Sequence, residues 1–341
     1  MKRRPLGRTG LEISEIGFGC GVAAGLLING SATERSAAVA RAIELGINYF
    51  DTAPVYGDSV SETHLGLALE ALGAAGAIVA SKVALEWSDL GDIFGAVVAS
   101  VEASIARLRL DRLPLIQLPN RVGPARAARG AIGSGAVLTV DDVLGERGVL
   151  EAFRSLRERG RVAWFGCCAY GGDIGAIERL IDSRAFDAML VNYSVLNTSA
   201  WRAPPVAGSV RDYGAVGRHA AQAGMGAVAL RVLEGGALSG SDGRHPNSGG
   251  SASPDLQSMI VRAAGLARAL PAAEAGLTDL AIRFVLANPS ISTALIGVSD
   301  LAQVEAAVAA AVRGPLGDSE IALIEQLRAR DFDRGDVVPP R

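Results

Sequence analysis

The chain alternates between short, almost uniformly apolar runs and longer segments whose apolar residues recur at helical spacing. The short runs are rich in β-branched residues and rarely alternate with polar ones, which is typical of strands covered on both faces. We predict eight such strands, at residues 16–20, 47–51, 77–83, 115–119, 162–168, 188–194, 227–233 and 292–298.

Amphipathic segments of helical length separate most of these runs. In residues 61–72, for example, Leu65, Leu69 and Leu72 form one apolar stripe. We predict seven helices, at residues 34–45, 61–72, 94–108, 149–159, 175–183, 216–223 and 278–287. Repeated alternation of strand and helix predicts a parallel sheet, and right-handed crossovers close such a sheet into a (β/α)8 barrel of the α/β class.

Two features fall outside the alternation. Residues 3–14 surround Thr9-Gly10 with apolar positions, which predicts a hairpin ahead of the first barrel strand. Gly/Ser/Ala-rich loops follow the fourth and seventh strands, at about 120–139 and 234–254, and in this fold they lie over the C-terminal face where active sites form. The 341 residues are expected to form one barrel domain, with a tail at about 330–341.

Composition narrows the classes of partner. The chain has 33 basic and 36 acidic residues, a net charge of −3, and no basic run beyond Lys2-Arg3-Arg4. Nucleic acid is therefore not an expected partner. No run of 18 apolar residues is present, so no membrane partner is expected. Three cysteines are too few for a secreted disulfide framework and favour a cytoplasmic protein. The oligomeric state stays open.

Three residues carry the candidate chemistry. Asp51 ends the second apolar run, Lys82 lies in the third, and Tyr56 follows Asp51 closely. The ends of neighbouring parallel strands meet, so Asp51 can pair with Lys82 within reach of Tyr56. An ammonium beside a phenol favours the phenolate and lowers the phenol pKa. Such a tyrosine can act as a general acid, giving its proton to a carbonyl oxygen while hydride adds to the carbon.

Several motifs of this chain resemble those of the aldo-keto reductases. They are Pro5-Leu6-Gly7-Arg8-Thr9-Gly10-Leu11, Gly46-Ile47-Asn48-Tyr49-Phe50-Asp51-Thr52-Ala53-Pro54-Val55-Tyr56-Gly57, Ser61-Glu62-Thr63-His64-Leu65-Gly66, Ser81-Lys82, Leu113-Pro114-Leu115-Ile116-Gln117-Leu118 and Leu233-Glu234-Gly235-Gly236-Ala237-Leu238-Ser239-Gly240. The resemblance covers nearly the whole chain. It implies a (β/α)8 barrel that binds an extended nicotinamide dinucleotide at its C-terminal face, without a Rossmann domain.

By this resemblance, Asp51, Tyr56 and Lys82 are three of the family's four catalytic residues. The fourth is a histidine at the end of the fourth strand, where this chain has Pro119 followed by Asn120. Proline offers no side-chain donor. Asn120 is not an obvious substitute, because neighbouring side chains of a strand point to opposite faces.

The resemblance also implies a cofactor site and a substrate pocket. The expected cofactor is NADPH. NADH is also possible, because Ser299 stands where the family has an arginine near the 2′-phosphate. Cys168-Ala169 and Leu190 stand where the family commonly grips the nicotinamide amide. The expected cofactor residues are Asp51, Cys168, Ala169, Leu190, Leu233, Gly236, Leu238, Ser239, Gly297, Ser299 and Gln303, and the expected pocket residues are Tyr56, Trp87, Pro119 and Asn120.

We expect an oxidoreductase acting on a small carbonyl or alcohol substrate. The missing histidine leaves room for reduction of a conjugated C=C bond, or for a nicotinamide-binding sensor or partner subunit. A Rossmann dehydrogenase is a third hypothesis, because residues 19–24 fit G-x-G-x-x-A. Cys167 and Cys168 are interpreted as core residues. A disulfide between them is not expected, since strand neighbours face opposite ways. The three histidines are too scattered to predict a metal site.

Overall fold

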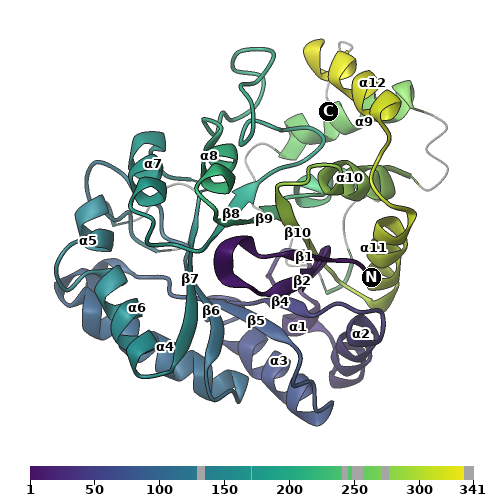
Figure 1. Cartoon of the computed structure of the whole chain (residues 1–341). Coiled ribbons are helices and arrows are strands. Elements are labelled where there is room, and N and C mark those ends of the chain that lie inside the picture. The colour runs from purple at the N-terminus through teal and green to yellow at the C-terminus, as the bar shows by residue number, and fades with distance from the viewer. Residues whose placement is uncertain (129–134, 170, 240–244, 248–255, 271–275, 334–341) are drawn as a thin grey trace.

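Eight parallel strands form a closed barrel at the centre of the molecule (Figure 1). The computed structural model describes residues 1–128, 135–169, 171–239, 245–247, 256–270 and 276–333. Around the barrel the strands follow the order β3 (Ile16–Gly19), β4 (Tyr49–Asp51), β5 (Ile78–Lys82), β6 (Leu113–Leu118), β7 (Val162–Cys168), β8 (Ala188–Asn192), β9 (Gly226–Leu230) and β10 (Ile291–Gly297), which closes on β3. All eight predicted strands are present, and the predicted (β/α)8 barrel is confirmed.

Helices surround the barrel, and short helices form part of its loops. They are α1 (Leu26–Asn29), α2 (Ala32–Glu44), α3 (Val60–Ala71), α4 (Ile93–Leu108), α5 (Val140–Leu144), α6 (Val149–Glu158), α7 (Ile174–Asp182), α8 (Val216–Gln222), α9 (Leu256–Ala269), α10 (Gly276–Leu286), α11 (Leu301–Arg313) and α12 (Asp318–Ala329). The seven predicted helices correspond to α2, α3, α4, α6, α7, α8 and α10. Across the described ranges, none of the helices is both long and apolar enough to cross a bilayer.

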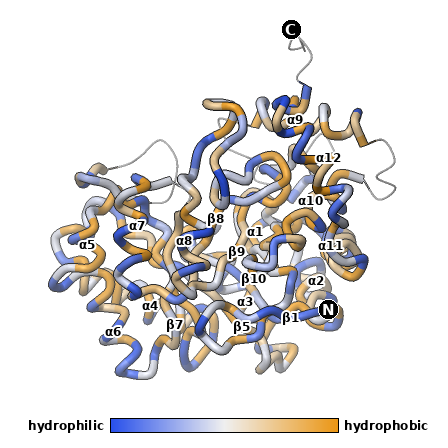
Figure 2. Tube along the Cα trace, turned by 45° about the horizontal axis from the view of Figure 1, so that its top comes forward, coloured by the Kyte–Doolittle hydropathy of each residue, from blue (hydrophilic) through white to orange (hydrophobic). Residues whose placement is uncertain are grey.

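Side chains of most barrel strands divide between two apolar clusters. On β8, Leu190 points into the barrel, whereas Met189 and Val191 pack outward beneath the helices. This alternation follows from the pleat, and burial on both sides explains the continuous apolar runs in the sequence. The outer helices bury one face and expose the other, visible in Figure 2 as hydrophobic and hydrophilic segments alternating along them.

The predicted hairpin lies across one end of the barrel, in purple at the centre of Figure 1. Its strands β1 (Arg3–Pro5) and β2 (Glu12–Ser14) pair antiparallel, and the 3₁₀ helix η1 (Gly7–Thr9) lies between them. Leu6 and Ile13 are fully buried against the inner cluster of barrel side chains. The hairpin therefore closes the N-terminal end of the barrel and leaves the C-terminal ends of the strands for a site.

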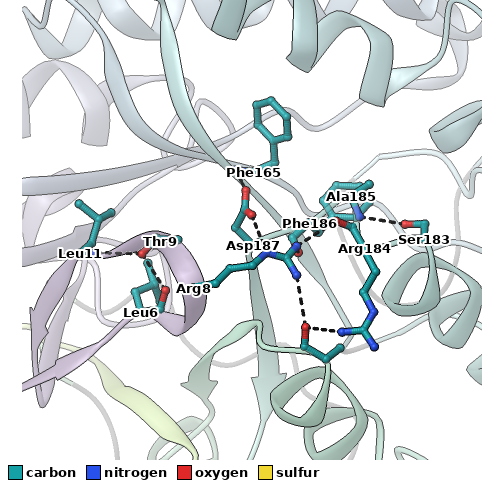
Figure 3. Close-up of polar contacts among 11 residues, drawn as sticks. Leu6, Arg8, Thr9, Leu11, Phe165, Ser183, Arg184, Ala185, Phe186 and Asp187 are labelled. Atoms are coloured by element: carbon teal, nitrogen blue, oxygen red, sulfur yellow. Dashed lines mark hydrogen bonds and ion pairs between the residues drawn. The ribbon is translucent and has the colours of Figure 1, made fainter.

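Arg8 fixes the hairpin to the barrel rim (Figure 3). Its guanidinium donates to the Asp187 carboxylate at 3.2 Å and to the carbonyl of Phe186 at 2.6 Å. Gly7 has φ +53°, and a Cβ there would lie 2.2 Å from the backbone nitrogen of Gly226. The hairpin thus approaches the barrel backbone more closely than any side chain at position 7 would permit.

The loops depart most from the sequence predictions. A third long loop, residues 193–215, follows β8, and the segment 193–200 is buried although it forms neither helix nor strand. An eighth outer helix, α11, was also not predicted. Residues 129–134, 240–244 and 248–254 of the two predicted loops, and 334–341 of the predicted tail, lie outside the described residues.

We expect Leu6→Ala to lower the free energy of unfolding by about 2–5 kcal/mol, because it opens a cavity under the hairpin. Val312→Ala is the matched control: Val312 is 72% exposed, so its truncation is expected to change stability by less than about 0.5 kcal/mol. Urea denaturation measures both. Equal effects of the two variants would contradict the structural role assigned to the hairpin.

Candidate active site

A buried ion pair joins the C-terminal ends of two neighbouring strands. Asp51 is the last residue of β4 and Lys82 the last of β5, and they are only 2% and 4% exposed. The Lys82 ammonium donates to Asp51 Oδ1 and, at 2.9 Å, to the carbonyl oxygen of Thr52. The pairing predicted from the strand ends is confirmed. A buried charge requires such partners because transfer out of water is costly.

Gln117 is a third member of this cluster, and the sequence analysis did not assign it to the site. It lies on β6 beside Lys82 in register and is fully buried. Its Nε2 donates to Asp51 Oδ2 at 2.8 Å, so both oxygens of the Asp51 carboxylate are bound. Its side chain lies across Gly166 of β7, where a Cβ would come within 3.0 Å of Gln117 Cγ. A glutamine inside an otherwise apolar run, two residues before Pro119, is the sequence signal that could have identified this residue.

Tyr56 is held over the ion pair by a strained loop. The Lys82 ammonium lies 4.9 Å from the centroid of its ring. The three residues that follow, Gly57, Asp58 and Ser59, all have left-handed φ angles of 63°, 51° and 70°. Left-handed backbone at a residue other than glycine costs on the order of 1 kcal/mol and persists only where the surroundings enforce it. Tyr56 also accepts from the backbone nitrogen of Ser61 at 3.2 Å, which ties the loop to the start of α3.

The electrostatics of Tyr56 differ from the sequence-based expectation. Burial raises the pKa of its phenol, and the nearby Lys82 charge, which acts to lower it, does not overcome that effect. The net pKa is above the ordinary tyrosine value of about 10. The expected lowering was therefore wrong in its net direction, because desolvation outweighs the ion. For Lys82 itself, burial acts to lower the pKa, but the Asp51 charge raises it and prevails. At neutral pH the site holds a protonated phenol beside a charged lysine.

A second buried network anchors α3 behind the site. Ser81 donates to Glu62, which also accepts from Arg107 at 2.7 Å. Ser61 donates to the carbonyl of Cys20 at 3.0 Å. The Ser61-Glu62 motif therefore joins α3 to β5 and to the loop after β3, and it stabilises the strands that carry Asp51 and Lys82.

The expected substrate pocket is only partly assembled. Pro119 is buried just beyond the end of β6. Asn120 Nδ2 donates to the carbonyls of Leu85 and Ala136, both at 2.8 Å, and its Oδ1 accepts from the nitrogen of Leu85. Asn120 thus joins two loops and has no free donor to replace a histidine. Trp87 begins the 3₁₀ helix η2 (Trp87–Gly91) and is 52% exposed.

The expected cofactor residues fall into two groups. Cys168 and Leu190 are partners in register on β7 and β8 and form an apolar inner wall, with Ala169 following. Gly297 ends β10 beside Gly19 of β3, and its backbone is exposed. An apolar wall and an exposed glycine backbone suit the ring and the backbone of an extended dinucleotide.

The second group surrounds the 3₁₀ helix η3 (Glu234–Gly236), which Leu233 precedes. The backbone nitrogens of Gly236, Leu238 and Ser239 all donate within this turn, and the Leu238 side chain is buried. The nitrogen of Ser299 donates to Gln303 Oε1 at 2.8 Å. Pyrophosphate binding by the turn therefore stays a prediction that requires its hydrogen bonds to rearrange.

Cys167 and Cys168 are core residues, as interpreted from the sequence. Cys20, Cys167 and Cys168 are free and buried. Cys167 belongs to the outer apolar cluster and Cys168 to the inner one, so the two face opposite ways. Burial raises the pKa of Cys168 to about 12. In the described part of the chain, no three His, Cys, Asp or Glu side chains form a metal-binding group.

Comparisons with known proteins agree with the fold. The sequence model of the aldo/keto reductase family matches residues 15–329. L-galactose dehydrogenase of Arabidopsis thaliana is 29% identical over 315 residues, covering 90% of this chain and 87% of the plant protein. The uncharacterized oxidoreductase YqkF of Bacillus subtilis is 24% identical, covering 97% and 98% of the two chains. An aldo-keto reductase structure from Bacillus halodurans, in its holo form, is similar with a TM-score of 0.70, 25% identity and 96% coverage of each chain.

We expect Lys82→Met to destabilise the protein by about 3–5 kcal/mol, because it leaves the Asp51 carboxylate buried without its cation. The double variant Lys82→Met/Asp51→Leu removes both charges, and it is expected to be more stable than the single variant. Urea denaturation at pH 7 measures both. A single variant that loses less than about 1 kcal/mol would contradict a buried pair.

Proposed function

Since the chain belongs to the aldo/keto reductase family, we propose that it transfers hydride between NAD(P) and a small carbonyl or alcohol substrate, with Tyr56 as general acid and base. The family and the fold support an NAD(P)-dependent oxidoreductase in general. The observation that supports the finer assignment is the buried Lys82–Asp51 pair beneath the Tyr56 ring.

Each residue of this cluster has a distinct part in the proposal. When bound, the reduced nicotinamide supplies two electrons as hydride to the carbonyl carbon. The Tyr56 hydroxyl gives its proton to the carbonyl oxygen, which becomes the alcohol. The Lys82 ammonium stabilises the negative charge that Tyr56 gains. Asp51 holds Lys82 in place, and Gln117 fixes the second carboxylate oxygen. In the reverse direction, Tyr56 accepts the proton of the alcohol.

Pro119 limits how well this site stabilises a carbonyl oxygen. Leu115, Gln117 and Pro119 alternate along one side of the chain, so Pro119 follows the residues that face inward. Asn120 does not supply a second donor, because both N–H groups of its amide bind loop carbonyls. The Gln117 amide is engaged with Asp51. Losing one such donor costs about 100- to 1000-fold in rate. We therefore propose slow carbonyl reduction, or a preferred substrate such as a conjugated C=C bond that depends less on oxygen stabilisation.

The choice between NADPH and NADH is part of the proposal. The sequence predicts NADPH as the cofactor, with NADH possible. The Asp300 carboxylate caps α11, accepting from the nitrogen of Gln303 at 2.8 Å, and directly follows Ser299. A 2′-phosphate requires a cation rather than a carboxylate at its site. This charge supports NADH as a cofactor at least as good as NADPH.

A nicotinamide-binding sensor or partner subunit is the alternative. Pro119 and the apolar Cys168, Ala169 and Leu190 favour it, because they remove polar groups from a site of this kind. The intact Asp51, Lys82 and Tyr56 argue against it, since a sensor has no evident need for a phenol beside a buried ammonium. Calorimetric binding of NADPH or NADH, with no turnover across a broad carbonyl panel, would favour the sensor.

We expect Tyr56→Phe to lower kcat by at least about 100-fold, the usual contribution of a positioned proton donor, and to leave the Kd of the dinucleotide nearly unchanged. Absorbance of the reduced nicotinamide follows turnover, and calorimetry follows binding. Wild-type turnover in the variant would refute the role of Tyr56. Loss of dinucleotide binding would instead show that the phenol is structural.

A further inference from the structure

The last residue of β8 carries a buried acceptor with no partner in the described part of the chain. Asn192 is 5% exposed, and its Nδ2 donates to the hydroxyl of Tyr213 at 2.6 Å. Its Oδ1 receives no hydrogen bond from any described residue. The bond to Tyr213 fixes the amide plane, so the side chain satisfies only its donor end. A buried acceptor left unpaired is unfavourable, and a ligand N–H placed there would be stabilising.

Alternation along β8 directs Asn192 into the barrel. Leu190, two residues earlier, belongs to the inner apolar cluster, and Leu230, the partner of Asn192 in register, packs against the same cluster. Leu190 in turn pairs with Cys168, which lies close enough to Tyr56 to contribute to the raised pKa of that phenol. The orphan oxygen therefore lies on the apolar inner wall that leads to the proposed proton donor.

Tyr213 provides a hydrogen-bond donor beside the acceptor of Asn192. It comes from the loop after β8, which the sequence analysis did not identify. Its oxygen accepts from Asn192 Nδ2, and in the described residues no group accepts its own hydrogen. Burial raises the pKa of Tyr213, so the phenol stays protonated at neutral pH. Asn192 Oδ1 and the Tyr213 hydroxyl thus present one acceptor and one donor on the same wall.

We propose that Asn192 and Tyr213 bind the primary carboxamide of the nicotinamide ring. The N–H of the carboxamide would donate to Asn192 Oδ1, and its carbonyl oxygen would accept from Tyr213. A ketone or aldehyde substrate has no N–H and would leave Asn192 unpaired, so the pair selects the cofactor rather than the carbonyl substrate. The inference rests on the proposed function, because it requires that a nicotinamide dinucleotide binds here.

The test compares two dinucleotides by calorimetry, without any turnover. One is NADH, and the other is its 3-acetylpyridine analogue, in which a methyl ketone replaces the carboxamide and removes only the N–H donors. If the wild type binds NADPH and not NADH, the comparison uses NADPH and the 3-acetylpyridine analogue of NADPH. The wild type is expected to bind the analogue about tenfold more weakly than NADH, the usual effect of leaving one buried acceptor unpaired.

Three variants separate the two contacts. Asn192→Leu is expected to weaken NADH binding and to make the two affinities nearly equal. Asn192→Asp keeps an acceptor in the same shape and is expected to retain the preference for NADH. Tyr213→Phe is expected to weaken the binding of both dinucleotides by a similar factor, because both keep a carbonyl group attached to the pyridine ring.

The outcomes separate a failure of the proposed function from a failure of the assignment of Asn192. If the wild type binds neither dinucleotide, the proposed function fails and the inference falls with it. If it binds NADH but Asn192→Leu retains the wild-type preference over the analogue, or if the wild type has no such preference, only the assignment of Asn192 is overturned. Thermal unfolding of each variant establishes that it is folded. Should the leucine variant fail to fold, the wild-type comparison of the two dinucleotides keeps the inference falsifiable, because the absence of a preference overturns it.

Discussion

The buried ion pair between Lys82 and Asp51 is the interaction on which the rest of the site depends. Neither charge is stable in the barrel alone, because contacts with apolar side chains do not offset the free energy lost when the charge leaves water. The register of β4 and β5 brings the two strand ends together, and Thr52 and Gln117 occupy the remaining hydrogen-bonding positions. The pair therefore fixes a positive charge beneath Tyr56, and the strained loop after β4 holds the ring above it.

The two ends of the barrel have different tasks. At the N-terminal end, the hairpin inserts Leu6 and Ile13 into the core, and Arg8 fastens it to backbone carbonyls. That end contributes stability. At the C-terminal end, the strands finish in Asp51, Lys82, Asn192 and the exposed backbone of Gly297. Polar groups at the ends of buried strands need partners, and those without one in the protein are where a ligand is expected.

Much of this arrangement could be predicted from the sequence, because buried parallel strands leave long apolar runs and polar residues at their ends stand out. That is why the eight strands and the pairing of Asp51 with Lys82 were found. Gln117 and Asn192 were missed because a single amide in an apolar run does not reveal its partner, which comes from another strand or from a loop. The loop 193–215 was missed because its buried segment looks like core, although hydrogen bonds from Asn197 and Ser199 hold it in irregular form. The direction of the Tyr56 pKa shift depends on a balance of burial and charge that sequence distance cannot supply.

The most direct test of the account is the pKa of the Tyr56 phenol, followed by NMR of tyrosine labelled with ¹³C at Cζ, in the wild type and in Lys82→Met. Removing the ammonium removes a charge that favours the phenolate, so the pKa of Tyr56, already raised by burial, is expected to rise further in the variant. An unchanged pKa would show that Lys82 does not act on Tyr56, and it would contradict the assignment of this tyrosine as the proton donor tuned by the buried pair.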